Sequence, residues 1–397
     1  MKKIKVAGVG CCLVDMLYRG IDFNQPFLKP YFSVKRGDGG LSPGKLVFRE
    51  EFEDFSGITL DSFLKSLVDG RDPDMVNIGG PAVVALIHAA QLLNTPNYEV
   101  SFYGRTGNDK LGQYLSSKLK NTSLVIKNFS LTEKPSPSTV VFSDPDYNEG
   151  HGERMFINSI GAAWDVMPDH LNDGFFDSDI AVFGGTALVP NIHDSLSGLL
   201  KKAKEQGSIT IVNTVFDFRN EKISQNSRWP LGESDESYPY TDLLITDREE
   251  AFRLSGSSDE ASAVEFFKSK GLSAFLMTRG IDDVIGYSDG SLFSSNPEFR
   301  LPVCESIVNE LRDLKTGDTT GCGDNFAGGV IAELARSLGN RSNKPDLKKA
   351  GALGVVSGGF ACFYIGGTYA ESHVGDKEQR INIYYKHYIK QLKGEQS

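Results

Sequence analysis

Short apolar runs alternate with amphipathic stretches along most of the chain, and this rhythm restricts the fold more than any single motif does. The apolar runs have the length of buried strands, and the stretches between them repeat apolar residues every three or four positions, as helices do. Such alternation implies right-handed βαβ crossovers, and therefore an α/β fold with a mostly parallel central sheet and helices on both faces. Ligands of such sheets bind at the carboxyl ends of the strands. Strands are predicted at 4–9, 100–103, 180–183, 209–212, 243–246 and 274–278, and helices at 81–93, 110–120, 192–206 and 247–255.

Two segments, 20–74 and 139–157, interrupt this alternation. The first is rich in Gly, Pro and Phe and holds period-two pieces such as Lys45–Arg49, and the second alternates in the same way around a turn-like stretch at 144–150. Because the two segments share this character, we predict that they pair into one small β-sheet, a lid that excludes water from the pocket. With 397 residues, the chain is long enough for one α/β domain spanning 1–397 with this lid appended.

The first of these segments carries an unusual number of aromatic residues for an exposed loop. Two outcomes are predicted for them: a homodimer through an apolar lid face, or an inward-packed core of a monomer's lid. The residues are Phe23, Phe27, Tyr31, Phe32, Phe48, Phe52 and Phe55.

The segment from Lys315 to Gly329 combines glycines, hydroxyls and two carboxylates immediately before a run with helical spacing. The first amides of a helix have no intrahelical partner and the helix dipole favours negative charge, so Gly321–Gly323 are predicted to form an anion hole for a phosphate. Asp324 then stands beside that phosphate, where a carboxylate is suited to take a proton from an attacking hydroxyl. The alternative is a merely capped helix start, which Asp and Thr also favour.

The stretch Asp318-Thr-Thr-Gly-Cys-Gly-Asp324-Asn-Phe resembles the C-terminal signature of the ribokinase-like (PfkB) carbohydrate kinases, in which alanine is usual at the Cys322 position. Three further stretches are similar to motifs of that family and follow in the family's order. They are Asn77-Ile-Gly-Gly-Pro-Ala82, Tyr103-Gly-Arg-Thr-Gly-Asn-Asp-Lys-Leu-Gly112 and Met277-Thr-Arg-Gly280.

The resemblance implies an ATP-dependent phosphotransferase with a ribokinase-like fold, and it implies roles for particular residues. Asp324 is the expected general base, and Gly321, Cys322 and Gly323 are the expected anion hole. For the substrate, the resemblance points to Asp15 as a carboxylate that accepts hydroxyls, with the backbone of Gly79 and Gly80 close by. Thr278 and Gly280 are expected to border the nucleotide.

The resemblance also implies two cations. Glu249 aligns with the acidic residue of the family's Asn-x-x-Glu element and is expected to reach Mg2+ through water, although Thr246 replaces the Asn. Asp318 and Thr320 match positions that contribute to a monovalent-cation site, such as one for K+, which would stiffen the anion hole.

The identity of the substrate stays open at this stage. An Asn usually lies four positions after the second glycine of the double-glycine motif, and here that position is Val84. A small sugar or sugar-like molecule is the first expectation. The alternatives are a nucleoside, because the stretches at 107–112 and 366–368 also resemble adenosine kinase, and a non-catalytic ligand-binding member of the family.

Composition fits a cytoplasmic enzyme that acts on small molecules. The formal net charge of −10 disfavours nucleic acid and anionic membranes as partners. No apolar stretch approaches the ~20 residues of a membrane span, and the start of the chain does not resemble a signal peptide. The five cysteines show no CxxC spacing, so they are predicted to be reduced thiols and not a disulfide framework or a zinc site.

Overall fold

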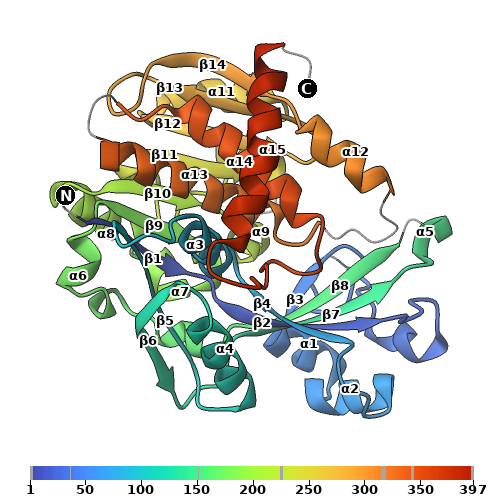
Figure 1. Cartoon of the computed structure of the whole chain (residues 1–397). Coiled ribbons are helices and arrows are strands. Elements are labelled where there is room, and N and C mark those ends of the chain that lie inside the picture. Colours follow the sequence, from blue (N-terminus) through green and yellow to red (C-terminus); the bar gives the residue numbers. More distant parts are fainter. Residues whose placement is uncertain are drawn as a thin grey trace.

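The computed structural model describes residues 3–35, 37–150, 152–223, 227–313, 319–340 and 344–394, and these form a large and a small β-sheet (Figure 1). The large sheet has the strand order β14-β13-β12-β11-β10-β9-β1-β5-β6. Its neighbouring strands are parallel from β6 to β12, and β13 runs antiparallel to both of its neighbours, β12 and β14. The bounds are β1 Ile4–Gly10, β5 Tyr98–Gly107, β6 Val125–Thr132, β9 Ile180–Gly184, β10 Ile209–Asn213, β11 Leu243–Asp247, β12 Ala274–Arg279, β13 Asp282–Ser288 and β14 Asn296–Leu301.

Helices cover both faces of the large sheet, as the sequence predicts. Successive side chains of a strand point to opposite faces, so Val182 packs into a core with α3, α13 and α14, whereas Phe183 packs into a second core with α7, α8 and α10. The helices are α1 Arg49–Ser56, α2 Leu60–Val68, α3 Pro81–Leu92, α4 Lys110–Lys120, α5 Tyr147–Gly150, α6 Asp173–Phe176, α7 Pro190–His193, α8 Leu196–Glu205, α9 Phe218–Ile223, α10 Arg248–Ser255, α11 Glu260–Ser269, α12 Glu305–Asp313, α13 Cys322–Asn340, α14 Leu347–Ala361 and α15 Asp376–Lys393. Within the described residues, none of them has the length and apolar character that crossing a membrane requires.

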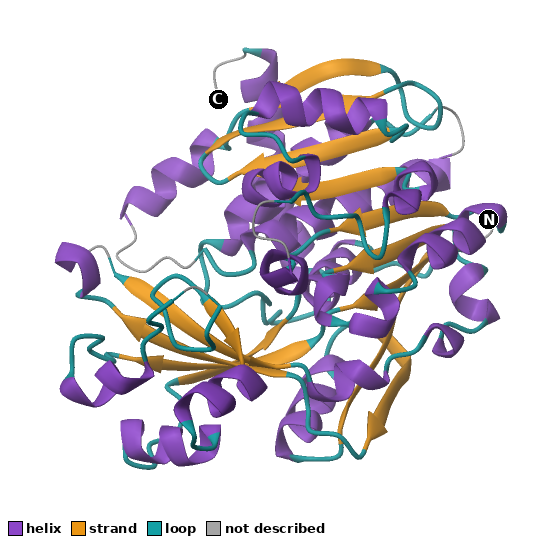
Figure 2. Ribbon diagram, turned by 180° about the vertical axis from the view of Figure 1, so that it is seen from behind, coloured by secondary structure: helices purple, strands orange, loops and turns teal. Residues whose placement is uncertain are grey.

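The small sheet confirms that the two interrupting segments pair into one structure. Its strand order is β3-β8-β7-β2-β4, and β3 runs parallel to β8 with Leu46 opposite Phe156. The first segment also contributes α1 and α2, helices that the sequence analysis missed, and they lie on the far side of the small sheet from the large one (Figure 2). The bounds are β2 Leu13–Arg19, β3 Leu46–Phe48, β4 Met75–Gly79, β7 Ser138–Asp144 and β8 Glu153–Ser159.

Most of the aromatic residues of the first segment pack into a core of the lid's own, whereas Phe48 packs into the second core of the large sheet. The rings of Phe52 and Phe63 are fully buried and pack edge-to-face, with their centroids 4.8 Å apart. The centroid of the Phe63 ring also lies 4.8 Å from that of Tyr31 and 6.0 Å from that of Phe142 in β7. Of the two outcomes predicted for these residues, the inward-packed lid core is the one that these contacts favour. The homodimer stays a prediction.

Two short connections join the lid to the large sheet. Only Cys11 and Cys12 separate β1 from β2, and only Gly80 separates β4 from α3. Gly80 has φ +105°, and a Cβ atom there would lie 2.5 Å from the carbonyl oxygen of Cys11. Glycine is therefore required where these two connections touch.

We predict that Phe63→Ala destabilises the protein by about 3–5 kcal/mol, the usual cost of emptying a buried aromatic site. Urea unfolding of the full chain, followed by circular dichroism and by tryptophan fluorescence, measures the change. Val34→Ala in the same segment is the control, because the Val34 side chain is 90% exposed and its loss is expected to change stability by less than about 0.5 kcal/mol. Equal effects of the two substitutions would contradict a lid core centred on Phe63.

Candidate active site

Helix α13 starts at the carboxyl edge of the large sheet, and its first turn carries Asp324. Gly321 precedes the helix with φ +76°. Its carbonyl accepts a hydrogen bond from the backbone N–H of Asn325 at 2.9 Å, the first hydrogen bond of the helix. The amides of the first turn point out of the helix, although that of Cys322 donates to the Thr319 carbonyl at 3.2 Å. A Cβ atom on Gly323 would meet no atom within 4 Å, so open space lies in front of this turn.

Asp324 of α13 lies near enough to the carboxylate of Asp15, in β2 of the small sheet, for its charge to act on that group. Burial raises the pKa of Asp324 to about 6. Burial also raises the pKa of Asp15 to about 7; a hydrogen bond from Thr139 opposes the rise, and the charge of Asp324 adds to it. The structure thus brings together the predicted base and the predicted substrate carboxylate, and each has a pKa near neutral.

Neighbouring strands of the small sheet hold Asp15 in place. Asn158 Nδ2 donates to Thr139 Oγ1 at 3.0 Å, and Thr139 in turn hydrogen-bonds to Asp15. A Cβ atom on Gly79 would lie 2.0 Å from Asp15 Oδ2, so the space that Asp15 occupies exists only because Gly79 lacks a side chain. Together with Gly80, this residue forms the double-glycine turn predicted to lie beside the substrate.

Arg154 is a site residue that the sequence analysis missed. It projects from β8 of the lid, and its Nη1 donates to Thr320 Oγ1 at 2.9 Å, just before α13. Its positive charge also lowers the pKa of Asp15. The alternation of side chains along β8 could have indicated Arg154. Met155 and Ile157 pack into the lid core, so Arg154 and Asn158 lie on the opposite face of the strand.

A buried amide clamps the loop in front of α13. Asn325 is fully buried, and its Nδ2 donates at 2.8 Å both to the Gly321 carbonyl and to the Gly367 carbonyl. Its Oδ1 accepts from Tyr364 Oη at 3.0 Å and from Lys377 Nζ at 2.9 Å. Burial lowers the pKa of Lys377 well below its usual range, while the charge of Glu371 opposes this shift.

A mostly apolar pocket of about 360 Å3 runs from the end of β12 to the start of α13. Thr278 and Gly280 line it, as do Cys322 and Gly323, so the predicted nucleotide residues and part of the predicted anion hole share one pocket. A volume of this size and an apolar lining suit a planar base, and the first turn of α13 suits phosphate oxygens. Its lining also includes Ile281, Cys304, Ile307, Phe326, Val355 and Cys362.

The two adjacent acids at the start of α10, Glu249 and Glu250, differ in burial. Glu249 is exposed on α10, whereas Glu250 is buried on the same helical face as Leu254. Burial raises the pKa of Glu250 to about 8, with further contributions from the charges of Asp247 and Asp324. The spacing of the Asn-x-x-Glu element is therefore met in space by Asp247 and Glu250, one position later than predicted.

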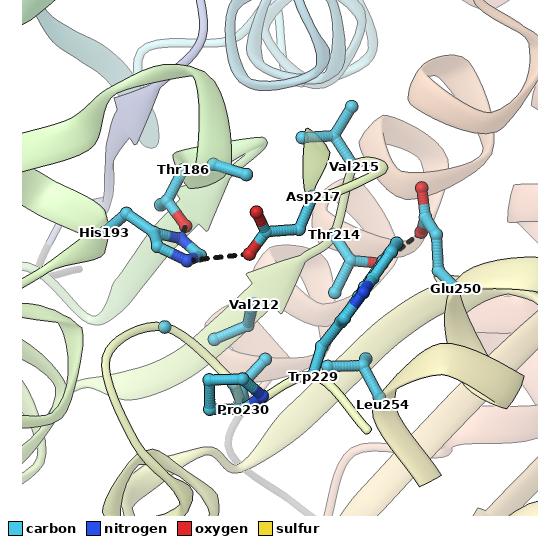
Figure 3. Close-up of a pocket in the computed structure, with 13 residues that line it drawn as sticks. Thr186, His193, Val212, Thr214, Val215, Asp217, Trp229, Pro230, Glu250 and Leu254 are labelled. Carbon is cyan, nitrogen blue, oxygen red and sulfur yellow. Dashed lines mark hydrogen bonds and ion pairs between the residues drawn. The ribbon is translucent and has the colours of Figure 1, made fainter. Parts of the chain in front are cut away.

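Figure 3 shows the polar contacts beside Glu250. Thr214, which follows β10, donates its hydroxyl to Glu250 Oε2. The same loop carries Asp217, whose carboxylate lies 3.1 Å from His193 Nε2, while His193 Nδ1 lies 3.0 Å from Thr186 Oγ1. Burial alone would raise the pKa of Asp217, but the bonds from His193 and Asn220 lower it. The pair thus fixes the loop that positions Thr214.

At the predicted monovalent-cation site, Thr320 is partly buried and accepts a hydrogen bond from Arg154. Its predicted partner Asp318 lies outside the described residues. Among the described residues, no group of three His, Cys, Asp or Glu side chains is close enough to hold a metal ion alone.

Comparison with known proteins identifies the class. The pfkB family of carbohydrate kinases matches residues 57–373, which is most of the chain. The chain belongs to this family, whose members are ATP-dependent phosphotransferases acting on sugars or nucleosides.

The individual relatives include both nucleoside and sugar kinases. The adenosine kinase of Schizosaccharomyces pombe is 26% identical over 287 residues, which cover 68% of this chain and 77% of that protein. The structure resembles an adenosine kinase from Sinorhizobium meliloti (TM-score 0.66, 19% identity, 95% of this chain and 99% of the other). It also resembles a ribokinase from Thermotoga maritima (TM-score 0.64, 16% identity, 96% and 99%). These structural similarities establish the ribokinase-like fold.

We predict that Lys377→Met lowers kcat by roughly 10- to 100-fold, because the Asn325 clamp loses a partner and the loop before α13 shifts. Steady-state kinetics on a sugar and nucleoside panel, together with the thermal midpoint of unfolding, measure the effect. Lys386→Met is the matched control, since Lys386 is exposed on the same helix α15. Tyr364→Phe removes only one bond to Asn325 and is expected to have a smaller effect. Full activity of Lys377→Met would show that the clamp does not depend on this amine.

Proposed function

We propose that this protein transfers the γ-phosphate of ATP to a hydroxyl of a small sugar or sugar-like substrate, with Asp324 as the general base. The observation that carries the proposal is a pair of buried, electrostatically interacting carboxylates, Asp324 in the first turn of a long helix and Asp15 in the small sheet. Purely structural carboxylates would gain little from such an arrangement, because burial and mutual repulsion disfavour both charges.

Each part of the site has a task in this scheme. Asp15 accepts hydrogen bonds from substrate hydroxyls, and Gly79 lets the substrate approach the backbone closely. Asp324 takes the proton of the attacking hydroxyl. Amides at Gly321–Gly323 and the guanidinium of Arg154 stabilise the charge that develops on the transferred phosphoryl group, and the lid excludes water.

We assign the base of ATP to the apolar pocket bordered by Thr278 and Gly280, with its phosphates directed to the first turn of α13. Mg2+, when bound, would bridge phosphate oxygens and offset their charge. We assign its protein contact to Glu250, through water. A monovalent cation such as K+ at Thr320 and Asp318 is the remaining part of the proposal, and it rests on the family resemblance alone.

An adenosine-type nucleoside is the second candidate substrate. The observation that favours it is the similarity to the adenosine kinase of S. pombe, which extends over 68% of the chain. Val84 also offers an apolar contact where an Asn is usual in this family, although this position alone does not distinguish a sugar from a nucleoside.

A panel of sugars and nucleosides, assayed for ADP release at a fixed ATP and Mg2+ concentration, separates the candidates. Turnover with a free sugar alone supports the first proposal, and turnover with adenosine alone supports the second. Binding of either class without ADP release would identify a non-catalytic member of the family.

We predict that Asp324→Asn lowers kcat by roughly 10²-fold or more while ATP still binds, because a general base contributes on this scale. Only an ionised carboxylate accepts a proton, so activity should decline as the pH falls through about 7 to about 6, where Asp15 and Asp324 become protonated. The pH profile of kcat/KM for the native chain measures this decline. In the Asp324→Asn protein, the residual activity should no longer show the decline near pH 6 that protonation of Asp324 causes. Near-native kinetics in a folded Asp324→Asn protein would refute the assignment.

For the magnesium contact, we predict that Glu250→Gln raises the Mg2+ concentration needed for half-maximal activity by roughly 10- to 100-fold, the usual effect of losing a partner around a metal. Glu249→Gln is the matched control on the adjacent, exposed position and is expected to leave this concentration unchanged. Titration with Mg2+ at constant ATP decides between the two residues. The reverse outcome would restore Glu249 as the contact.

A further inference from the structure

Two thiols meet where the anion-hole helix crosses the end of α14. Cys322 is the first residue of α13, and Cys362 directly follows α14. Their sulfur atoms lie 3.4 Å apart, and both side chains are partly accessible. Both residues also line the apolar pocket that ends at Gly323.

We propose that Cys322 and Cys362 are a modification site, a thiol pair that forms a reversible disulfide and thereby closes the nucleotide pocket. A disulfide bond is ~2.05 Å long, so the two sulfur atoms need to approach by roughly 1.4 Å, a change that side-chain rotation and a small backbone shift can supply. The effect on the pocket rests on the proposed nucleotide site, whereas the formation of the disulfide does not.

The chemistry requires an oxidant, and a small-molecule disulfide such as glutathione disulfide suffices. A helix N-terminus stabilises a thiolate, so Cys322 is the attacking sulfur. Its thiolate displaces one glutathione thiolate and forms a mixed disulfide. The Cys362 thiolate then attacks the Cys322 sulfur and releases the second glutathione. Two protein thiols are oxidised to one disulfide, and one glutathione disulfide is reduced to two thiols.

The other three cysteines are poorly placed to react. Cys11, Cys12 and Cys304 are all buried. Burial raises the pKa of both Cys11 and Cys12 above the usual range of a thiol, which keeps them protonated. The geometry therefore selects one pair among the five thiols.

A bond between these residues would act on the anion hole directly. The end of α14 packs tightly on the start of α13, since a Cβ atom on Gly358 would lie 2.9 Å from the Cys322 carbonyl oxygen. Because the two helices are already in close contact, bringing the two sulfur atoms to bonding distance displaces the first turn of α13 and its amides. A nucleotide in the pocket would conversely cover both sulfur atoms and slow their oxidation.

The test treats the reduced full-length protein with glutathione disulfide, with and without an ATP analogue. We expect a mass lower by two hydrogen atoms, the loss of two titratable thiols, and a peptide in which Cys322 is linked to Cys362. The ATP analogue should slow this reaction. Oxidation should lower kcat/KM for ATP by at least roughly tenfold relative to the same protein when reduced, and dithiothreitol should restore it.

Variants make each part of the proposal separable. Cys362→Ser should stop at the mixed disulfide on Cys322, Cys322→Ser should form neither product at this site, and the control Cys304→Ser should still form the cross-link. Mixed disulfides without a cross-link in the native chain would overturn the thiol pair. A cross-linked protein with unchanged kcat/KM for ATP would overturn the closure of the pocket. If the reduced protein phosphorylates no member of the panel, the proposed function fails, but mass measurement still tests the disulfide.

Discussion

The site depends on one side chain, the buried amide of Asn325. Its two donors reach the carbonyls of Gly321 and Gly367, so it ties together two loops that are far apart in the sequence and sets the direction in which α13 begins. The amide also needs its acceptor satisfied, because an unpaired buried polar atom costs about 1–3 kcal/mol. Lys377 of α15 and Tyr364, which follows α14, meet that need, so α15 and the segment after α14 belong functionally to the site.

The electrostatics of the site follow from its position between two sheets. Asp15 belongs to the lid, Asp324 and Glu250 belong to helices on the large sheet, and burial raises the pKa of all three. Arg154 reaches Thr320 from the lid, and its charge favours the ionised form of Asp15. Three buried carboxylates with one guanidinium nearby leave the site short of positive charge, which a divalent cation would supply.

Sequence patterns predicted the parallel sheet, because each strand and helix carries its own periodicity. They also predicted Asp324, Gly79 and Gly80, since glycines at a turn and an acid at a helix start are local signals. The sequence pattern predicted Glu249, whereas Glu250 is the buried acid of this helix. Adjacent helical residues differ by about 100° in direction, so a motif aligned by spacing alone does not tell the buried from the exposed acid. Arg154 and the Asn325 clamp could not be predicted with the same ease, because they act between segments more than 40 residues apart.

The lid's own aromatic core has a consequence for how substrate binding is driven. A sheet stabilised by its own buried rings keeps its shape when the pocket is empty, so substrate does not have to supply the conformational entropy of folding it. Two of the connections between this sheet and the rest of the chain, at Cys11–Cys12 and at Gly80, are only one or two residues long. Because the lid sheet is already formed, the strength of substrate binding is set by the contacts between that sheet and the substrate.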